Sequence, residues 1–339
     1  MQPEPALSRA PVATPPTRPP WRLRGNPALT RFGPTVALLV MWALFSLLTP
    51  RFLTISNFRD IVAQSSIPLI LAVGLTFVII GGMIDLSIEG VMAVSAVAVS
   101  LLVLNNRNDL DLGLLGVAIA IALGGLMGFL NGLFHVWLRI PSFMVTLGMW
   151  SVGAGIATIL YKGMPVAVMD PMVRNWVLGT TLGFSNLVLF ALAVLAIGWF
   201  IERFTRVGRY AYVIGGSEEI ARLAGVPLGR YKIALFTFAG LCSGLGGVLI
   251  AARLGQGTSN VGAGTLFAAV TAVVVGGTAL SGGTGGVLQT LVGVLFVTSL
   301  NNGMILLGID PYVQQTVQGV LIVIAVSLTM DRKRVPIIK

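Results

Sequence analysis

Few side chains in this sequence could carry out catalysis or bind a metal ion. Its 339 residues include one histidine, His135, and one cysteine, Cys242, whereas a metal site needs a cluster of such ligands at suitable spacing. No lysine follows a glycine in the Gly-Lys-Ser/Thr order that closes a phosphate-binding loop. We therefore expect no catalytic residue, no metal site and no cofactor in this chain; if ATP drives its function, another subunit binds it.

Two acidic residues stand next to an apolar run, in the sequence Gly-Gly-Met-Ile-Asp-Leu-Ser-Ile-Glu-Gly at 81–90. One interpretation is helix initiation, with Asp85 or Ser87 capping free amides and Glu89 meeting the positive end of the helix dipole. The other is that this glycine-hinged turn borders a translocation path or contacts a cytoplasmic partner. The two interpretations are compatible.

A short amphipathic helix is predicted within the long polar segment 203–232. Ser217 is a good N-cap, two glutamates follow in the first turn, and Gly225 with Pro227 ends the helix. The apolar residues Ile220, Leu223 and Ala224 share one face. Because a helix of about two turns is unstable alone in water, it must dock either on its own chain or in a groove of a soluble subunit.

The overall composition indicates that these segments belong to a membrane protein. Hydrophobic residues make up 55% of the chain and charged residues 10%, and the mean hydropathy is +0.92. So few charges cannot cover a water-facing surface, which excludes a soluble globular enzyme. Hydropathy predicts an all-α, polytopic membrane bundle of about ten transmembrane helices. They are expected at 34–50, 61–81, 88–104, 112–134, 143–160, 184–201, 232–252, 265–280, 286–307 and 312–330.

The basic residues predict the orientation of this bundle, with both termini cytoplasmic. With ten spans, only six of the 22 Lys and Arg residues fall on the outer side, namely Arg51, Arg59, Arg107, Lys162, Arg174 and Arg253. The net charge of +10 is thus explained by topology, and nucleic acid is not expected as a partner. We expect a Pro/Arg-rich disordered cytoplasmic arm at 1–31, a transmembrane domain at 32–331 and a basic cytoplasmic tail at 332–339.

Glycines predict both close helix packing and irregular segments. Gly124, Gly128 and Gly132 recur at four-residue spacing, which lets helix backbones approach closely; plain bundle packing is favoured over a dedicated dimerisation seam. The intervals 81–88 and 276–286 are candidates for bent or partly re-entrant elements. They also share a short similarity, Gly-Gly-Met-Ile-Asp-Leu-Ser at 81–87 and Gly-Gly-Thr-Ala-Leu-Ser at 276–281, of the kind that transporters place near a substrate path.

Five motifs in order resemble the permease subunit of bacterial ABC sugar importers of the ribose, xylose and arabinose branch, which belongs to the branched-chain amino acid and sugar permease family. They are GGMIDLSIEGVMAVSA, IPSFMVTLGMWSVGAGIA, TRVGRYAYVIGGSEEIARLAGVPLGRYKI, AAVTAVVVGGTALSGGTGGVLQTLVG and Leu-Asn-Asn-Gly at 300–303. The resemblance covers about 52–330 and implies a type II importer-like bundle in the bacterial inner membrane.

This resemblance also implies partners and site residues. A permease dimer, with a second copy or a paralogue, would lie in membrane lipid, dock ABC ATPase subunits that carry ATP and Mg, and receive solute from a periplasmic sugar-binding protein. The residues that match the family's coupling loop, with its N-cap, are Ser217, Glu218, Glu219, Ala221, Leu223 and Gly225. The residues expected at the gating turn or the path are Asp85, Ser87, Glu89, Thr146, Met149, Ser151, Asn301 and Asn302.

Several alternatives stay open at this point. Thr146 and Ser151 could instead bond to backbone within the bundle. Glu89 departs from the small residue common in sugar permeases and resembles nucleoside-type permeases, so a nucleoside or branched-chain amino acid importer is an alternative to a sugar or polyol importer. An ion-coupled carrier working without partners, or a non-transporting membrane scaffold, is less well supported, because the acidic residues avoid the centres of the spans.

Overall fold

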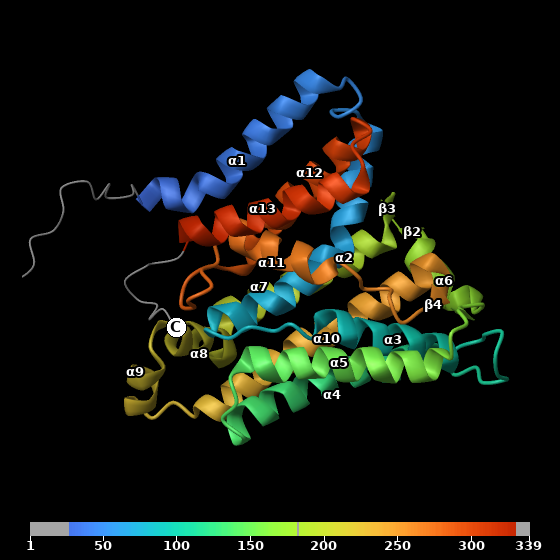
Figure 1. Ribbon diagram of the computed structural model, residues 1–339, viewed down its shortest axis with the longest axis horizontal. Coiled ribbons are helices and arrows are strands. Elements are labelled where there is room, and N and C mark those ends of the chain that lie inside the picture. The colour runs from blue at the N-terminus through green and yellow to red at the C-terminus, as the bar shows by residue number, and fades with distance from the viewer. Residues whose placement is uncertain (1–26, 182, 330–339) are drawn as a thin grey trace, which may run out of the picture.

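The computed structural model describes residues 27–181 and 183–329, and within these ranges the chain is built almost entirely from helices (Figure 1). The four strands are only two residues long and form two small antiparallel pairs, β1 with β4 and β2 with β3. The elements are α1 (Pro27–Leu48), α2 (Ile55–Ile80), α3 (Ile88–Leu102), α4 (Gly113–Trp137), α5 (Ser142–Tyr161), β1 (Val166–Ala167), α6 (Pro171–Leu178), β2 (Thr180–Thr181), β3 (Phe184–Ser185), α7 (Asn186–Phe204), α8 (Arg206–Gly216), α9 (Glu218–Leu223), α10 (Leu228–Leu254), β4 (Gln256–Gly257), α11 (Thr265–Val275), α12 (Val287–Leu306) and α13 (Pro311–Thr329).

Each of the ten apolar runs predicted from the sequence coincides with a helix: α1, α2, α3, α4, α5, α7, α10, α11, α12 and α13. Among the described residues, six helices are long and apolar enough to cross a membrane, namely α2, α4, α5, α7, α10 and α12. Three further apolar helical stretches are shorter, at 32–48, 88–102 and 265–275. The chain is therefore an all-α, multi-pass membrane bundle, while the number of ten spans stays a prediction.

The helix connections gather at two opposite ends of the bundle. At one end, which we call the α9 end, the segments 81–87, 138–141, 205–227 and 276–286 lie together with the start of α1 and the end of α13 (Figure 1). At the other, the α6 end, β1 pairs with β4, and the guanidinium of Arg107 donates to the carbonyl oxygens of Leu160 and Met164 at 3.1 Å each. This alternation is the arrangement that the sequence predicted for the loops.

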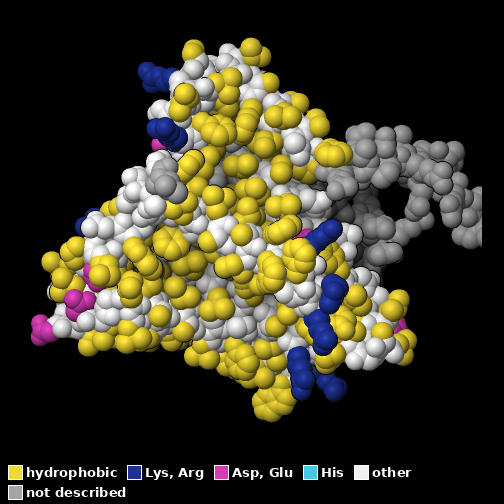
Figure 2. Space-filling model, turned by 180° about the vertical axis from the view of Figure 1, so that it is seen from behind, with side chains coloured by type: hydrophobic (Ala, Val, Ile, Leu, Met, Phe, Trp, Pro, Cys, Tyr) yellow, Lys and Arg dark blue, Asp and Glu magenta, His cyan; other side chains and the backbone are white. Residues whose placement is uncertain are grey.

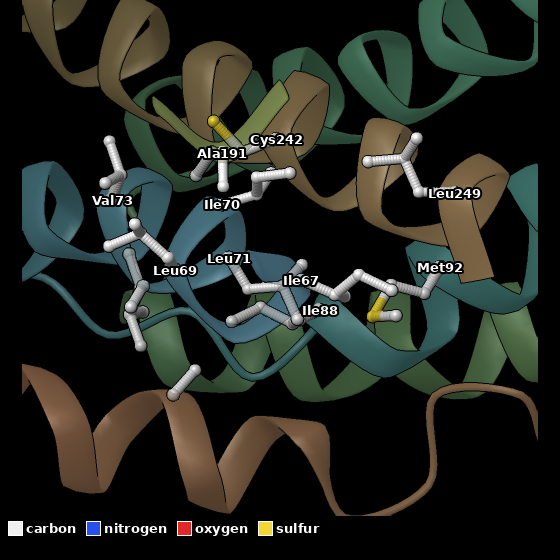
Figure 3. Packing of buried hydrophobic residues seen from close by; sticks show 14 of the residues in the cluster. Ile67, Leu69, Ile70, Leu71, Val73, Ile88, Met92, Ala191, Cys242 and Leu249 are labelled. Atoms are coloured by element: carbon white, nitrogen blue, oxygen red, sulfur yellow. The ribbon is translucent and has the colours of Figure 1, made fainter. Parts of the chain in front are cut away.

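The core of the bundle is formed around α2, which is buried along most of its length and contacts α7, α8, α10, α11 and α12. Figure 3 shows Ile70 of α2 facing Cys242 of α10 and Ala191 of α7. The helix begins at the N-cap Thr54, whose hydroxyl accepts the amide of Asn57. It ends at Gly81 and Gly82, the latter with φ of +74°, a conformation that favours glycine.

Glycines bring α4 and α10 into direct backbone contact. A Cβ atom at Gly124 would lie 2.6 Å from the carbonyl oxygen of Gly240 and 2.6 Å from the Cα atom of Gly244. Gly128 likewise lies against Gly240. The four-residue spacing therefore serves packing within one bundle, as predicted, and no larger side chain fits at these crossings.

Two of the apolar helices, α3 and α11, are short, and a non-helical segment precedes each of them. α3 has 15 residues, about 22 Å at 1.5 Å per residue, and follows the non-helical segment 81–87. α11 has 11 residues, about 16 Å, and follows the segment 255–264. Both are shorter than the roughly 30 Å hydrocarbon core of a bilayer.

The segment 255–264 runs antiparallel to α3. Gly257 lies against Ser100 and the carbonyl oxygen of Ala96, and Gly262 lies against Glu89 and Met92. The chain thus passes from near the end of α3 to its first turn before α11 begins. The sequence predicted an irregular element at 81–88 but did not predict this second one.

The surface of the bundle is mainly hydrophobic, and Lys and Arg side chains gather along one edge of it (Figure 2). Exposed arginines of the segment 203–230 lie at the α9 end, namely Arg203, Arg206, Arg209, Arg222 and Arg230. α1 begins at Pro27, inside the segment predicted as the arm. The rest of that arm and the tail at 332–339 lie outside the described residues.

Candidate coupling and translocation site

The helix predicted after Ser217 is present as α9 and projects from the bundle (Figure 1). The Ser217 hydroxyl accepts the amide of Ile220 at 3.3 Å, which is the capping bond that the sequence predicted. Gly225 follows with φ of +74° and ends the helix in the left-handed conformation that glycine tolerates. Ser217 and Gly225 therefore define the two ends of this short helix.

One face of α9 is fixed to the bundle. Lys232 of α10 donates to a carboxylate oxygen of Glu218 at 2.8 Å, and Arg222 lies 3.5 Å from the other oxygen. Partial burial favours the neutral form of Glu218, but the Lys232 hydrogen bond and the charges of Lys232 and Arg222 outweigh it and lower the pKa of Glu218. Ala221 is buried beneath the helix. Glu218, the first residue of α9, therefore attaches this helix to α10.

The opposite face of α9 is apolar and exposed. The side chains of Ile220 and Leu223 are 66% and 83% exposed, and Ala224 is exposed beside them. Of the two docking interpretations left open by the sequence, docking of this face on its own chain is not seen among the described residues. Exposed apolar side chains on a short, fixed helix are typical of a surface that binds a partner.

A pocket of about 420 Å³ opens beside α9. It lies between the end of α4, the turn at 139–141 and the start of α10, and its lining includes Arg139, Arg222 and Lys232 together with Glu218. The pocket lies next to the apolar face of α9, and most of its charged lining residues are basic.

The two glycine-rich turns of the α9 end meet each other and the end of α8. The Gly283 amide donates to the Ile80 carbonyl oxygen at 2.8 Å. A Cβ atom at Gly282 would lie 2.7 Å from the Cα atom of Gly82 and 2.9 Å from that of Gly215. A Cβ atom at Gly215 would overlap the Ile80 carbonyl oxygen. We call the contact of Gly82, Gly215, Gly282 and Gly283 the glycine junction; it connects the residues that precede α9 to both turns.

The turn 81–87 is stabilised by buried polar side chains. An Asp85 carboxylate oxygen accepts the Ser87 amide at 2.8 Å and the Ser87 hydroxyl at 2.6 Å. The Asn131 side-chain amide of α4 donates to that hydroxyl at 2.8 Å. Within the described part of the chain, the Asn131 carbonyl oxygen has no hydrogen-bond partner. Asp85 and Ser87 thus shape the turn and join it to α4.

The side chains of α5 bind the same turn from the other side. The Thr146 hydroxyl accepts the Leu86 amide at 3.0 Å, and the Ser142 hydroxyl accepts the Ile84 amide at 3.0 Å. Thr146 is fully buried. Its role here is the alternative that the sequence left open, a hydrogen bond to backbone within the bundle.

Glu89 lies in the first turn of α3, as predicted, but the side-chain caps predicted for Asp85 or Ser87 are not seen in the described residues. In the described residues, Ser87 occupies the N-cap position of α3 without a side-chain bond to a helix amide, and Asp85 bonds Ser87 itself. Glu89 accepts the Leu266 amide in the first turn of α11 at 3.1 Å. The carboxylate in the first turn of α3 thus also caps α11, a contact that the sequence did not predict.

Two of the residues predicted for the path lie elsewhere in the packing. Met149 is buried in a hydrophobic cluster with Val91 and Val94 of α3. The Ser151 hydroxyl is exposed on α5 and donates to the Leu147 carbonyl oxygen at 3.4 Å. Neither forms a polar contact with the turn 81–87 among the bonds of the described residues.

Asn301 and Asn302 lie on the half of α12 nearer the α6 end, apart from Asp85 and Thr146. The Asn301 side-chain oxygen accepts the Gln318 amide of α13 at 2.8 Å. Asn302 is buried, and its side-chain oxygen has no hydrogen-bond partner in the residues that the structure describes. The predicted path residues therefore form two groups rather than one site.

Sequence reasoning missed Glu202 and Tyr212. The Glu202 carboxylate accepts the Tyr212 hydroxyl of α8 at 2.7 Å and the Val287 amide at the start of α12 at 2.9 Å. Burial, followed by the hydrogen bond to Glu202 and its charge, raises the pKa of Tyr212. The available signal was an acidic residue directly after the apolar run 184–201. Across the described ranges, no group of three or more His, Cys, Asp or Glu residues could hold a metal ion.

Comparisons with known proteins agree on the family. The family described as the permease component of the branched-chain amino acid transport system matches residues 57–326. The ribose import permease protein RbsC of Escherichia coli strain K12 is 36% identical over 304 residues, which cover 88% of this chain and 92% of that protein. No solved structure matches the chain.

Two further relatives from the same strain bear the names of sugar permeases. The galactose/methyl galactoside import permease protein MglC is 32% identical over 87% of this chain and 93% of its own length. The D-allose transport system permease protein AlsC is 30% identical, over 88% of this chain and 91% of its own. With its apolar helices, its projecting α9 and these matches, the chain belongs to the family of permease components of branched-chain amino acid transport systems.

Proposed function

We propose that this chain is the permease subunit of an ATP-driven importer for a monosaccharide or a related polyol. The names of the ribose, galactose and allose permeases support the substrate class. In this proposal the chain forms a dimer in the bacterial inner membrane, with about ten spans and both termini in the cytoplasm. A periplasmic binding protein delivers the solute at the α6 end, and separate ATPase subunits, which hold ATP and Mg, dock at the α9 end.

The observation that carries the proposal is the exposed apolar face of α9. Ile220 and Leu223 stand out on a helix that is capped at both ends and attached to α10 by Glu218 and Lys232. A helix of six residues is not stable on its own. Its fixed geometry supports a role as a rigid contact that transmits movement from an ATPase groove.

The glycine junction gives this movement a route into the bundle. Gly215 lies two residues before the α9 N-cap and contacts both the turn before α3 and the turn before α12. Because these contacts are between backbones, a displacement of α9 shifts the turns directly instead of being absorbed by side-chain rotation. These two turns orient α3 and α12. Movement of the two helices would then open the translocation path alternately toward the α9 end and the α6 end.

Docking can be tested by placing a charge on the exposed face of α9. We expect Leu223→Asp to abolish co-purification of the ATPase and ATP-dependent sugar uptake in proteoliposomes, because an aspartate cannot enter an apolar groove without losing hydration. Thermal unfolding of the permease should be unchanged, since Leu223 contacts solvent. Leu178→Asp, at an exposed leucine of α6 on the opposite end, is the matched control and should leave ATPase docking intact.

Two results would overturn the proposal. Normal co-purification and uptake by Leu223→Asp would exclude α9 as the docking element. Uptake by the permease alone, in liposomes with an imposed ion gradient and without an ATPase, would make the chain an ion-coupled carrier.

A further inference from the structure

A second pocket, of about 210 Å³, lies between the start of α11 and the middle of α13. Its lining consists of Gly264, Phe267, Gln315, Gln318 and Gly319. We call it the α11–α13 pocket. None of the side chains that line it is charged. The proposed function places α11 and α13 within the membrane.

The two glutamines need an explanation because amide side chains are costly in lipid. Gln315 is exposed on the surface of this single chain. Gln318 uses its side-chain nitrogen to donate to Asn301 at 2.8 Å, and that bond leaves the carbonyl oxygen of the same amide as an acceptor. Polar side chains within the membrane generally face a water-filled cavity or a partner rather than hydrocarbon.

The remaining walls of the pocket provide an apolar surface and space. Phe267 is an exposed aromatic residue, while Gly264 and Gly319 carry no side chain that would fill the volume. Gly264 has φ of +81°, which a residue with a Cβ atom adopts only with strain. The wall is held in place by Glu89, whose carboxylate accepts the amide of Leu266 between Gly264 and Phe267.

An aromatic face beside neutral amides suits a small hydroxylated ring. Such a ring presents C–H groups that pack on an aromatic face and hydroxyl groups that both donate to and accept from amides. A zwitterionic amino acid would require charged partners, which this lining lacks. The volume is also below the roughly 300–1,000 Å³ that is typical of small-molecule pockets, which favours a single small ring over a ligand of two ring systems.

We propose that the α11–α13 pocket is a subsite for one neutral, polyhydroxylated ring during its passage through the permease. Gln315 and Gln318 bind its hydroxyl groups, Phe267 packs against its C–H face, and Glu89 is a positioning residue that acts through α11. The inference rests on the proposed function, because it assigns this pocket to the path of the imported solute. The small number of contacts favours release, as passage through a conduit requires.

The experiment uses the full complex of permease, ATPase and binding protein in proteoliposomes, with D-ribose, D-allose and D-galactose as probes. For the sugar that the unaltered complex imports fastest, we expect Gln315→Leu to lower uptake about three- to tenfold, the effect of one lost hydrogen bond. Gln315→Asn should restore part of it. ATPase docking and the thermal stability of the complex should not change, since Gln315 is exposed.

Thr316→Val provides the matched control on the same helix. Thr316 is exposed, lies outside the pocket lining and donates only to the Tyr312 carbonyl oxygen of its own helix among the bonds described. We expect it to import sugar as the unaltered complex does. If Gln315→Leu and Thr316→Val behave alike while the unaltered complex imports sugar, the subsite is excluded and the proposed function stands. If the unaltered complex imports none of the three sugars, the proposed function itself fails.

Chemical labelling separates the subsite from an interface between two copies of the chain. Cys242 is buried, so Gln315→Cys would supply the reactive thiol among the residues that the structure describes. In the assembled complex during turnover, we expect the transported sugar to slow labelling of this thiol by a small polar maleimide. A spontaneous disulfide between two permease copies at Gln315→Cys, with no effect of sugar, would instead show that the second copy covers the pocket.

Discussion

Hydrogen bonds to side chains hold the non-helical turn 81–87 in place. The turn has free backbone amides because it is neither helix nor strand, and such amides need acceptors elsewhere in the structure. Ser142 and Thr146 accept two of these amides, and Asp85 accepts a third. Each residue therefore replaces a bond that a continuous helix would have made for itself.

At the residue scale, we predict that Thr146→Val destabilises the permease by about 1–3 kcal/mol, since it leaves the partly buried Leu86 amide without its acceptor. Valine has nearly the same shape, so packing should be preserved. Thr158→Val on the same helix is the control, because Thr158 is exposed and donates to its own helix at Ala154. Denaturation of the purified protein in detergent measures both effects, and equal stability of the two variants would contradict the structural role of Thr146.

At the scale of elements, the glycine junction depends on the absence of side chains at particular positions. Gly215 and Gly216 are neighbours at the end of α8, yet a Cβ atom at Gly215 would overlap Ile80, whereas one at Gly216 would meet no described atom within 4 Å. Sequence alone treats the two residues as equivalent. Only the approach of the two turns distinguishes them.

We predict that Gly215→Ala lowers stability by about 1–3 kcal/mol through overpacking and reduces sugar uptake per folded complex. Gly216→Ala should change neither quantity. Thermal unfolding and ATP-dependent uptake in proteoliposomes measure the two effects. A normal uptake rate for Gly215→Ala, once corrected for folded protein, would exclude the glycine junction from coupling.

The elements could be predicted from the sequence to the extent that their signals are local. Hydropathy located the ten apolar helices, and the Ser217 cap with Gly225 located α9, because caps and periodicity lie within a few residues of each other. The sequence placed Glu89 in the first turn of α3 but could not predict its bond to Leu266, since that bond joins residues far apart in the chain. The Gln318–Asn301 pair and the irregular segment 255–264 were missed for the same reason.

At the scale of the whole molecule, the distribution of charge predicts which end faces the cytoplasm. Exposed arginines crowd the α9 end (Figure 2), and positively charged loops stay on the cytoplasmic side during insertion. The pocket beside α9 and the exposed face of this helix would then be accessible to soluble ATPase subunits.

Orientation can be measured with single cysteines at exposed positions of the two ends. In intact cells stripped of their outer membrane, we expect an impermeant maleimide to label Thr181→Cys in β2 and not Arg206→Cys in α8. In inverted membrane vesicles the pattern should be reversed. Labelling of Arg206→Cys from outside would place α9 in the periplasm and remove the basis for ATPase docking.

The short lengths of α3 and α11 also have a consequence for the insertion of the chain into the membrane. An insertion channel that recognises segments by length and hydrophobicity finds in α11 only 11 helical residues, well short of about 20. This segment cannot hold its own place in lipid as it leaves the ribosome. In the bundle α11 contacts α2, α12 and α13, and the last two follow it in the chain, so we expect α11 to be enclosed only after those two helices have been made.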